Sequence, residues 1–205
     1  VRTERVAADQ DRNAMLRQVD HLNQELAASD ILAHIGTERV AKRLGDSGTL
    51  EYWKSAPYLL NFMDSYKLKR DLNRALESRH DTEIEQTLMD GSTGLLDREE
   101  ISTYGELDPG NSRMRTLSND MIESGAWKLL WLAPSLPYYR PEGPFSDATL
   151  QRMTKRLIFS NWNVVPKAIS AVISYSAEKK LAGQAGISDN STRARKVRSG
   201  RLAFG

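Results

Sequence analysis

The 205-residue chain contains no cysteine, which excludes disulfides, thiolate metal sites and cysteine nucleophiles. Its three histidines, His21, His34 and His80, stand far apart and form no HExxH or related spacing. No apolar run approaches the roughly 18 residues of a membrane span, so we expect no membrane contact. With 40% hydrophobic and 27% charged residues, the composition is typical of a globular cytoplasmic protein.

The sequence also lacks the short motifs of nucleotide and hydrolase chemistry. No G-x-x-x-x-G-K-[ST] or GxGxxG loop is present to hold phosphates, and no GxSxG elbow occurs. The segment "DREE" at 97–100 contains paired carboxylates, but such clusters are common on solvated helices and do not indicate a catalytic site. We therefore expect no catalytic residue, metal site or cofactor site within this chain.

Charge is distributed unevenly along the chain. Residues 150–205 hold eleven Lys and Arg against two acids, whereas residues 1–149 hold eighteen basic and twenty-five acidic residues. Such an asymmetry fits a polyanion-binding end and an acidic remainder that repels polyanions. An ordinary solvated surface is the alternative interpretation.

Apolar spacing predicts a mainly α-helical chain. After an extended segment at 1–8 we expect a helix from Asp9 to Ala28. A second helix is expected to be capped by Asp30 and to end at Gly45, with Ile31, Ile35, Val40 and Leu44 inward. In the aromatic segment 51–76 we expect a helix with Ser55 as its cap and Pro57 in its first turn, which either runs on to Leu76 or breaks near Asp64. Further helices are expected at the ranges 81–89, 97–103, 112–124 and 148–153, the first two within an acidic, exposed flank at 78–110.

The stretch "KRLIFSNWNVVPKAISAVISYSAEKK" at 155–180 has a different pattern. Its apolar run predicts a buried strand near 156–160. A helix follows, with Asn163 as its cap and Pro166 in its first turn. The inward stripe of that helix comprises Val165, Ile169, Val172, Ile173 and Ala177. Beyond Gly183 the composition predicts disorder.

This stretch resembles the start of the second RecA-like lobe in large bacterial helicase-like proteins of the Swi/Snf-related superfamily 2 type. The resemblance is carried by the Ser160-x-Trp162 corner, by "PKAI" at 166–169 and by "SYSAE" at 174–178. Three more segments are similar to that group and occur in the same order. They are "RTERV" at 2–6, "EYWKSAPYLLNFMDSY" at 51–66 and "LPYYRPEGPF" at 136–145.

The resemblance implies four regions. Residues 1–8 would follow the first ATPase lobe, 9–146 would form a helical inter-lobe or insertion region, 147–183 would begin the second lobe, and 184–205 would be a basic flexible tail. ATP and magnesium would be bound by the full-length protein, outside this segment, so the segment alone is expected to be inactive. The start at Val1, without a signal-peptide pattern, fits excision from a longer protein or natural processing. The partners implied are the other ATPase lobe of the same chain and nucleic acid, with DNA preferred.

In such an enzyme the residues after this strand face the nucleic-acid backbone. The resemblance therefore makes Ser160, Asn161 and Trp162 the first candidates for contact, with Lys155, Arg156 and Lys167 as phosphate partners. The structural alternative is that Trp162 packs beneath its own helix. Weaker candidates are Arg2 and Arg5 and the tail residues Arg193, Arg195, Lys196, Arg198 and Arg201.

Two other classes of function remain open on the sequence. The chain could be a helical protein–protein adaptor that docks through its acidic middle, or a free-standing nucleic-acid-binding module.

Overall fold

The computed structural model describes residues 2–4, 17–19, 26–78, 81–91, 93–129, 142–147, 150 and 157–197, and these are mainly helical, as predicted. The longer helices are α1 (Ala28–Arg43), α4 (Lys67–Ser78), α5 (Thr82–Met89) and α9 (Val164–Gln184). The shorter ones are α2 (Leu50–Ser55), α3 (Leu59–Phe62), α6 (Arg98–Ser102), α7 (Ser112–Ser118) and α10 (Thr192–Val197). A π-helical turn, η1 (Asn119–Glu123), continues α7, and 3-10 turns follow at η2 (Ala126–Leu129) and η3 (Gly143–Ser146). Strands β1 (Arg2–Glu4) and β2 (Arg17–Val19) pair antiparallel.

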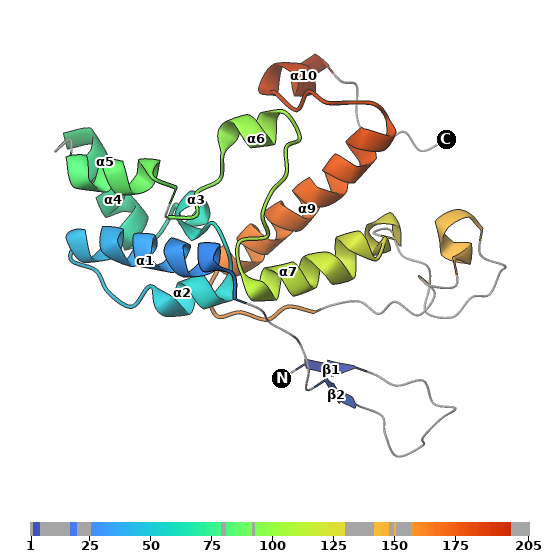
Figure 1. The fold of residues 1–205 in the computed structure, drawn as a ribbon, viewed down its shortest axis with the longest axis horizontal. Helices are drawn as coiled ribbons and strands as arrows, with labels where there is room; N and C mark the ends of the chain where they lie inside the picture. The colour runs from blue at the N-terminus through green and yellow to red at the C-terminus, as the bar shows by residue number, and fades with distance from the viewer. Residues whose placement is uncertain are drawn as a thin grey trace.

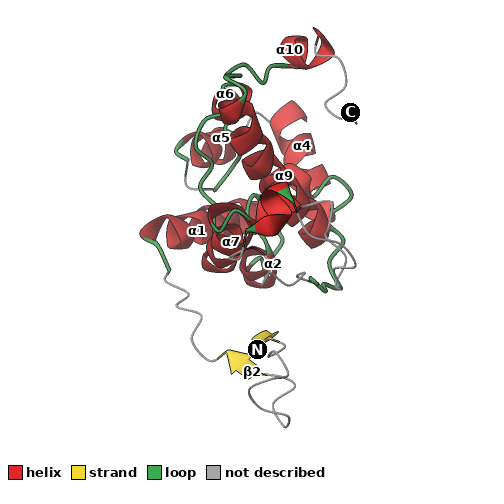
Figure 2. Ribbon diagram, turned by 90° about the vertical axis from the view of Figure 1, so that its right-hand side faces the viewer, coloured by secondary structure: helices red, strands yellow, loops and turns green. Residues whose placement is uncertain are grey.

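Helix α9 is the element around which the fold is organised (Figure 1). Its first half packs on α3, where Val164, Val165 and Ala168 meet Leu59 and Met63. Its second half packs on the turns after α7, where Ala177 meets Ile122 and Trp127. In the view turned by 90°, α9 is seen at the centre, with α1, α2 and α7 below it and α5 and α6 above it (Figure 2).

A separate hydrophobic core joins α1, α3, α4 and α5. Its buried members are Val40, Ala41, Leu60, Leu68, Leu72, Ala75 and Ile84. Each fully buried Leu or Ile stabilises the fold by about 1.5–3 kcal/mol relative to exposure. Because Ile84 of α5 is 1% exposed, the acidic region 78–110 contributes to the core and is more than an exposed flank.

Helix α1 presents only part of its predicted face to the core. Val40 is 1% exposed and Leu44 packs against the core, as predicted, but Ile31 and Ile35 are 48% and 40% exposed. The buried face carries small residues, Gly36, Thr37 and Ala41, beside Val40. Small side chains let neighbouring backbone approach closely, so the packed face of α1 is not its most apolar one. Gly45, with φ +72, ends this helix as predicted.

The predicted strand near 156–160 is wrong for residues 157–160, which form an irregular and exposed segment. Leu157 is 78% and Phe159 87% exposed. A strand needs a neighbour that accepts and donates its backbone hydrogen bonds. No strand lies beside 157–160 within the part of the chain that the structure describes.

Two further predictions fail on described residues. The helix expected from Asp9 to Ala28 is interrupted, because 17–19 pair as β2; the rest of that range up to 25 lies outside the described residues. Disorder after Gly183 is also wrong as far as residue 197. Asn190 is 4% exposed there, and its side chain donates to the carbonyl of Ile101 at 2.9 Å.

The remaining helix predictions are mostly confirmed. The aromatic segment breaks near Asp64, between α3 and α4, but Ser55 ends α2 and α3 begins only at Leu59, so Ser55 and Pro57 do not start a helix. Helices α5 and α6 occupy the predicted ranges, and α7 with η1 covers 112–123 before Gly125 (φ +83). The predicted stripe of α9 faces inward. Of the expected helix at 148–153 only Leu150, helical and buried, lies within the described residues.

Candidate nucleic-acid interface

The predicted contact residues gather at the start of α9, although not all can be placed. Ser160 and Asn161 are exposed in the segment that leads into the helix, and Trp162 is 37% exposed. Lys155 and Arg156 lie outside the described residues. Lys167, in the first turn of α9, is already paired, because its Nζ lies 2.6 Å from Asp64 Oδ2. This pairing holds the pKa of Asp64 below its ordinary value.

The hydroxyl of Ser160 is oriented by its own turn. The backbone N–H of Trp162 donates to Ser160 Oγ at 3.0 Å. A hydroxyl has one donor and two acceptor positions, so this contact uses an acceptor and leaves the O–H to donate elsewhere. On an exposed turn, that donor is suited to a phosphate oxygen.

The N-terminus of α9 itself has few backbone donors to offer an anion. The N–H of Val164 donates to Tyr66 Oη at 3.4 Å, and the N–H of Val165 donates to the carbonyl of Trp162 at 3.1 Å. Pro166 has no N–H. The helix therefore contributes the positive end of its dipole, while direct hydrogen bonds fall to the side chains of the preceding turn.

A groove of about 280 Å³ runs along this turn. Phe159 and Ser160 form one side of it, and the start of α7 forms another through Arg113 and Met114. The remaining lining residues are Ser55, Pro57, Asn111, Leu117, Ile158, Val165 and Ile169. The structure thus brings an exposed arginine from α7 to the residues predicted from the opening of α9.

Sequence reasoning missed Arg113. The helical period of α7 marks Arg113 as outward-facing beside the buried Met114, which is correct. Nothing in the sequence relates α7 to residues 158–160, about 45 positions later. Arg113 and residues 158–160 line one groove only because α7 and α9 pack against shared partners.

None of the weaker candidates within the described residues lines this groove. Arg195 is a structural residue, since its Nε donates to Asn190 Oδ1 at 2.8 Å and its Nη2 lies 3.8 Å from Glu178. Arg193 and Lys196 lie on α10, and Arg2 lies in β1. Arg5, Arg198 and Arg201 lie outside the described residues.

Within the residues that the structure describes, no group of three or more His, Asp and Glu side chains is arranged to hold a metal ion. In the same residues no helix is both long and apolar enough to cross a membrane. No family model, curated protein or solved structure matches the chain.

Proposed function

We propose that this chain is the inter-lobe region and the beginning of the second RecA-like lobe of a nucleic-acid-dependent, helicase- or translocase-like ATPase. The groove between Arg113 and residues 158–160 is the surface that faces the nucleic-acid backbone. The sequence resemblance supports this assignment, and one structural observation carries it further. That observation is the exposure of the apolar run that leads into α9.

Side chains as apolar as Leu157 and Phe159 are seldom left so open to solvent side by side. The helix that follows them is well packed, since Val164 and Val165 are 2% and 3% exposed. A strand of a parallel sheet is apolar on both faces because it is covered on both faces. Residues 157–160 form no strand in the described structure. In the proposed full-length protein, a neighbouring part of the second lobe would cover the apolar side chains of this run.

The chemistry of the groove fits a phosphate backbone. Ser160 supplies an O–H donor, and the exposed Asn161 beside it supplies an amide. Arg113 supplies a guanidinium, which suits phosphate oxygens. None of the described residues that line the groove is acidic. The site can hold a strand, but it carries no group that would hydrolyse one, and the chain alone should show no ATP turnover.

Substitution of Arg113 tests this proposal. Binding of a fluorescein-labelled single-stranded DNA is measured by anisotropy across a salt series for wild type, Arg113→Gln and Arg39→Gln. Arg39 is the matched control, because it is an exposed arginine on α1 and does not line the groove. Loss of one phosphate contact should lower the slope of log affinity against log salt by about 0.7 for a single strand.

The expected result is weaker binding and a lower salt slope for Arg113→Gln, with Arg39→Gln close to wild type. Equal effects of the two substitutions would mean that binding depends on total charge alone, and the groove would not be the interface. Absence of any DNA binding by the wild-type chain would contradict the proposed function itself.

A further inference from the structure

One side of α1, here called its outer face, carries Ile31, Leu32 and Ile35 and then Arg39 and Lys42. The three apolar side chains remain open to solvent, being 48%, 55% and 40% exposed. They occupy two successive turns and lie together, because residues three and four apart share a side of a helix. Single exposed apolar residues are ordinary, whereas a group on one face indicates a surface that another molecule covers.

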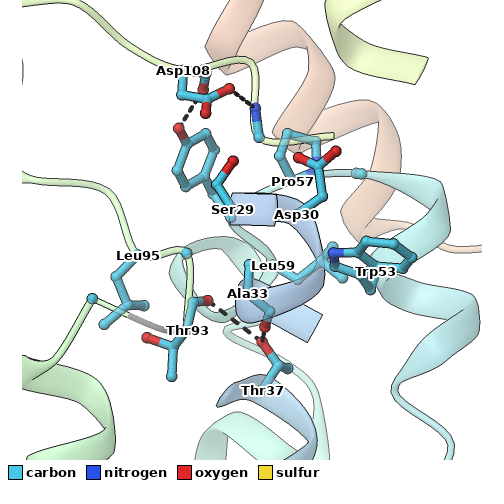
Figure 3. Close-up of a pocket in the computed structure, with 15 residues that line it drawn as sticks. Ser29, Asp30, Ala33, Thr37, Trp53, Pro57, Leu59, Thr93, Leu95 and Asp108 are labelled. Carbon is cyan, nitrogen blue, oxygen red and sulfur yellow. Dashed lines mark hydrogen bonds between the residues drawn. The ribbon is translucent and has the colours of Figure 1, made fainter. Parts of the chain in front are cut away.

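The opposite side of α1 is the one that packs. Asp30, Ala33 and Thr37 recur at intervals of three and four residues and line a pocket beside the loop 91–95 (Figure 3). There Thr37 Oγ1 lies 3.4 Å from the carbonyl of Thr93. Helix α1 is thus held in the fold by this side, and its outer face is available to a partner.

The outer face has an apolar end and a cationic end. Arg39 and Lys42 follow Ile35 at intervals of four and three residues, so they continue the same side of the helix over the next two turns. Both cations are exposed. Lys42 Nζ lies 3.9 Å from Glu38, and 70% of the Lys42 side chain is open to solvent. An exposed pair of this kind contributes little, so Lys42 can turn to another carboxylate.

The two acids of α1 point away from the outer face. Asp30 is 1% exposed and is paired with Arg115. Glu38 is turned toward α2, because it accepts a hydrogen bond from Thr49 Oγ1 at the entry to that helix. The charge of the outer face is therefore positive, and it is separated from the apolar end along a surface about 16 Å long.

These properties define the chemistry of a partner. Apolar side chains are best covered by other apolar side chains, and the two cations favour carboxylates. An α-helix supplies both kinds of residue in one row. Its ridges of side chains also pack along a neighbouring helix over several turns.

We propose that the outer face of α1 binds an amphipathic, acidic α-helix of a partner protein. Apolar residues of that helix cover the apolar end, and its carboxylates, one to two turns further along, face Arg39 and Lys42. The proposal goes beyond nucleic-acid binding, because none of the outer-face residues lines the groove that contains Arg113.

Two other occupants fit this surface less well. A second copy of the chain would bring its own cations to the face, where they would meet the cations or the apolar residues of the first copy rather than carboxylates. A helix that lies on an anionic membrane typically carries Trp, Phe or Leu on one face and Lys or Arg along the other. In α1 the exposed cations stand beyond one end of the apolar residues instead.

The test measures binding of fluorescein-labelled helical peptides by anisotropy. Each peptide has about 14 residues, or four turns, with leucine along one face of one half and glutamate along the same face of the other half. Both orders of the two halves are used, and a second pair of peptides has lysine in place of glutamate. Leu32→Gln changes the apolar end, and Arg39→Gln changes the cationic end. Leu181→Gln is the matched control, since Leu181 lies on α9 and is 53% exposed, against 55% for Leu32.

Wild type and Leu181→Gln should bind a glutamate peptide alike, and the matching lysine peptide roughly tenfold more weakly. Leu32→Gln and Arg39→Gln should each weaken binding of the glutamate peptide roughly fivefold or more. Their melting temperatures should stay near wild type, because both side chains are exposed. Absence of peptide binding, equal binding of the lysine peptide, or equal weakening by Leu181→Gln would each overturn the proposal.

Two further measurements address the other occupants. Sedimentation that shows a dimer of the wild-type chain, lost in Leu32→Gln, would replace the partner helix by a second copy. Co-flotation with vesicles of phosphatidylcholine and phosphatidylserine, lost in the same variant, would replace it by a membrane. Either result would overturn the proposal. Arg39→Gln should keep its DNA binding close to wild type, so a loss of peptide binding in that variant is distinct from any change at the nucleic-acid groove.

Discussion

Arg115 donates from both Nη atoms to the two carboxylate oxygens of Asp30, which lies 85 positions earlier in the chain. Asp30 is 1% exposed, and its Oδ2 also accepts the N–H of Ala27 at 2.9 Å, at the start of α1. One carboxylate therefore caps α1 and ties it to α7. Because α7 supplies Arg113 to the groove, this pair helps to hold the candidate interface in place.

Replacing Asp30 by Asn should destabilise the protein by about 3 kcal/mol, the lower end of the cost of breaking a buried ion pair. The lower end applies because the Arg115 side chain is 27% exposed and retains Asp108 at 3.6 Å. Urea unfolding followed by circular dichroism measures the change. Asp64→Asn is the control, since it removes the exposed pair with Lys167 and should leave stability unchanged within error. Equal midpoints for both variants would show that the Asp30–Arg115 pair contributes no more than a surface contact.

The same pair predicts how stability depends on pH. Burial alone would raise the pKa of Asp30, but the hydrogen bonds from Arg115 and Ala27 outweigh it, and the pKa is lowered. A carboxyl with a lower pKa in the folded state stabilises the fold above its unfolded pKa of about 3.9. That stabilisation is lost as pH falls through the folded value. The free energy of unfolding should therefore be nearly constant from about pH 5 to 7 and fall below about pH 4. The Asp30→Asn variant should show a smaller acid loss than wild type.

Local chemistry in the sequence predicted where helices end better than how they pack. Gly45 and Gly125 end helices as expected because their positive φ is readily adopted by glycine. Ile31 and Ile35 were wrongly placed on the buried face of α1, because its packing uses Gly36 and Thr37 instead. A pattern of hydrophobic residues does not reveal where small side chains let two backbone segments pack closely.

The strand predicted at 157–160 and the disorder predicted beyond Gly183 are wrong for another physical reason. Both depend on hydrogen bonds to residues that are distant in the sequence. The composition of the run at 157–160 is that of a strand, but composition cannot supply the neighbour that a strand needs. Asn190 becomes buried through bonds to Ile101 and Ser102, far away in sequence. The site shows the same limit: its residues at 160–162 could be chosen from the sequence, whereas Arg113 joins them only through the fold.

Gly110 should tolerate substitution less well than Gly45, although both have positive φ, +79 and +72. A Cβ at Gly110 would lie 2.6 Å from the Cβ of Pro57, whereas one at Gly45 meets nothing within 4 Å. Gly45→Ala should cost about 1–2 kcal/mol from backbone strain alone. Gly110→Ala should add about 1–3 kcal/mol for the steric conflict. Thermal unfolding of the two variants side by side measures the difference, and equal losses would mean that the loop 108–110 moves away from Pro57 at little cost.

Trp162→Ala separates stacking from packing at the interface. The ring is 37% exposed, so much of its surface is open to a base. Loss of stacking should weaken single-stranded DNA binding by about 1–3 kcal/mol, with the salt slope unchanged because no charge is removed. If the ring instead packs beneath its own helix, the same substitution should cost about 3–5 kcal/mol of fold stability. Affinity and melting temperature of this one variant distinguish the two roles. We expect the first outcome, because Trp162 remains 37% exposed in the segment that leads into α9. A variant with wild-type melting and wild-type affinity would assign Trp162 neither role.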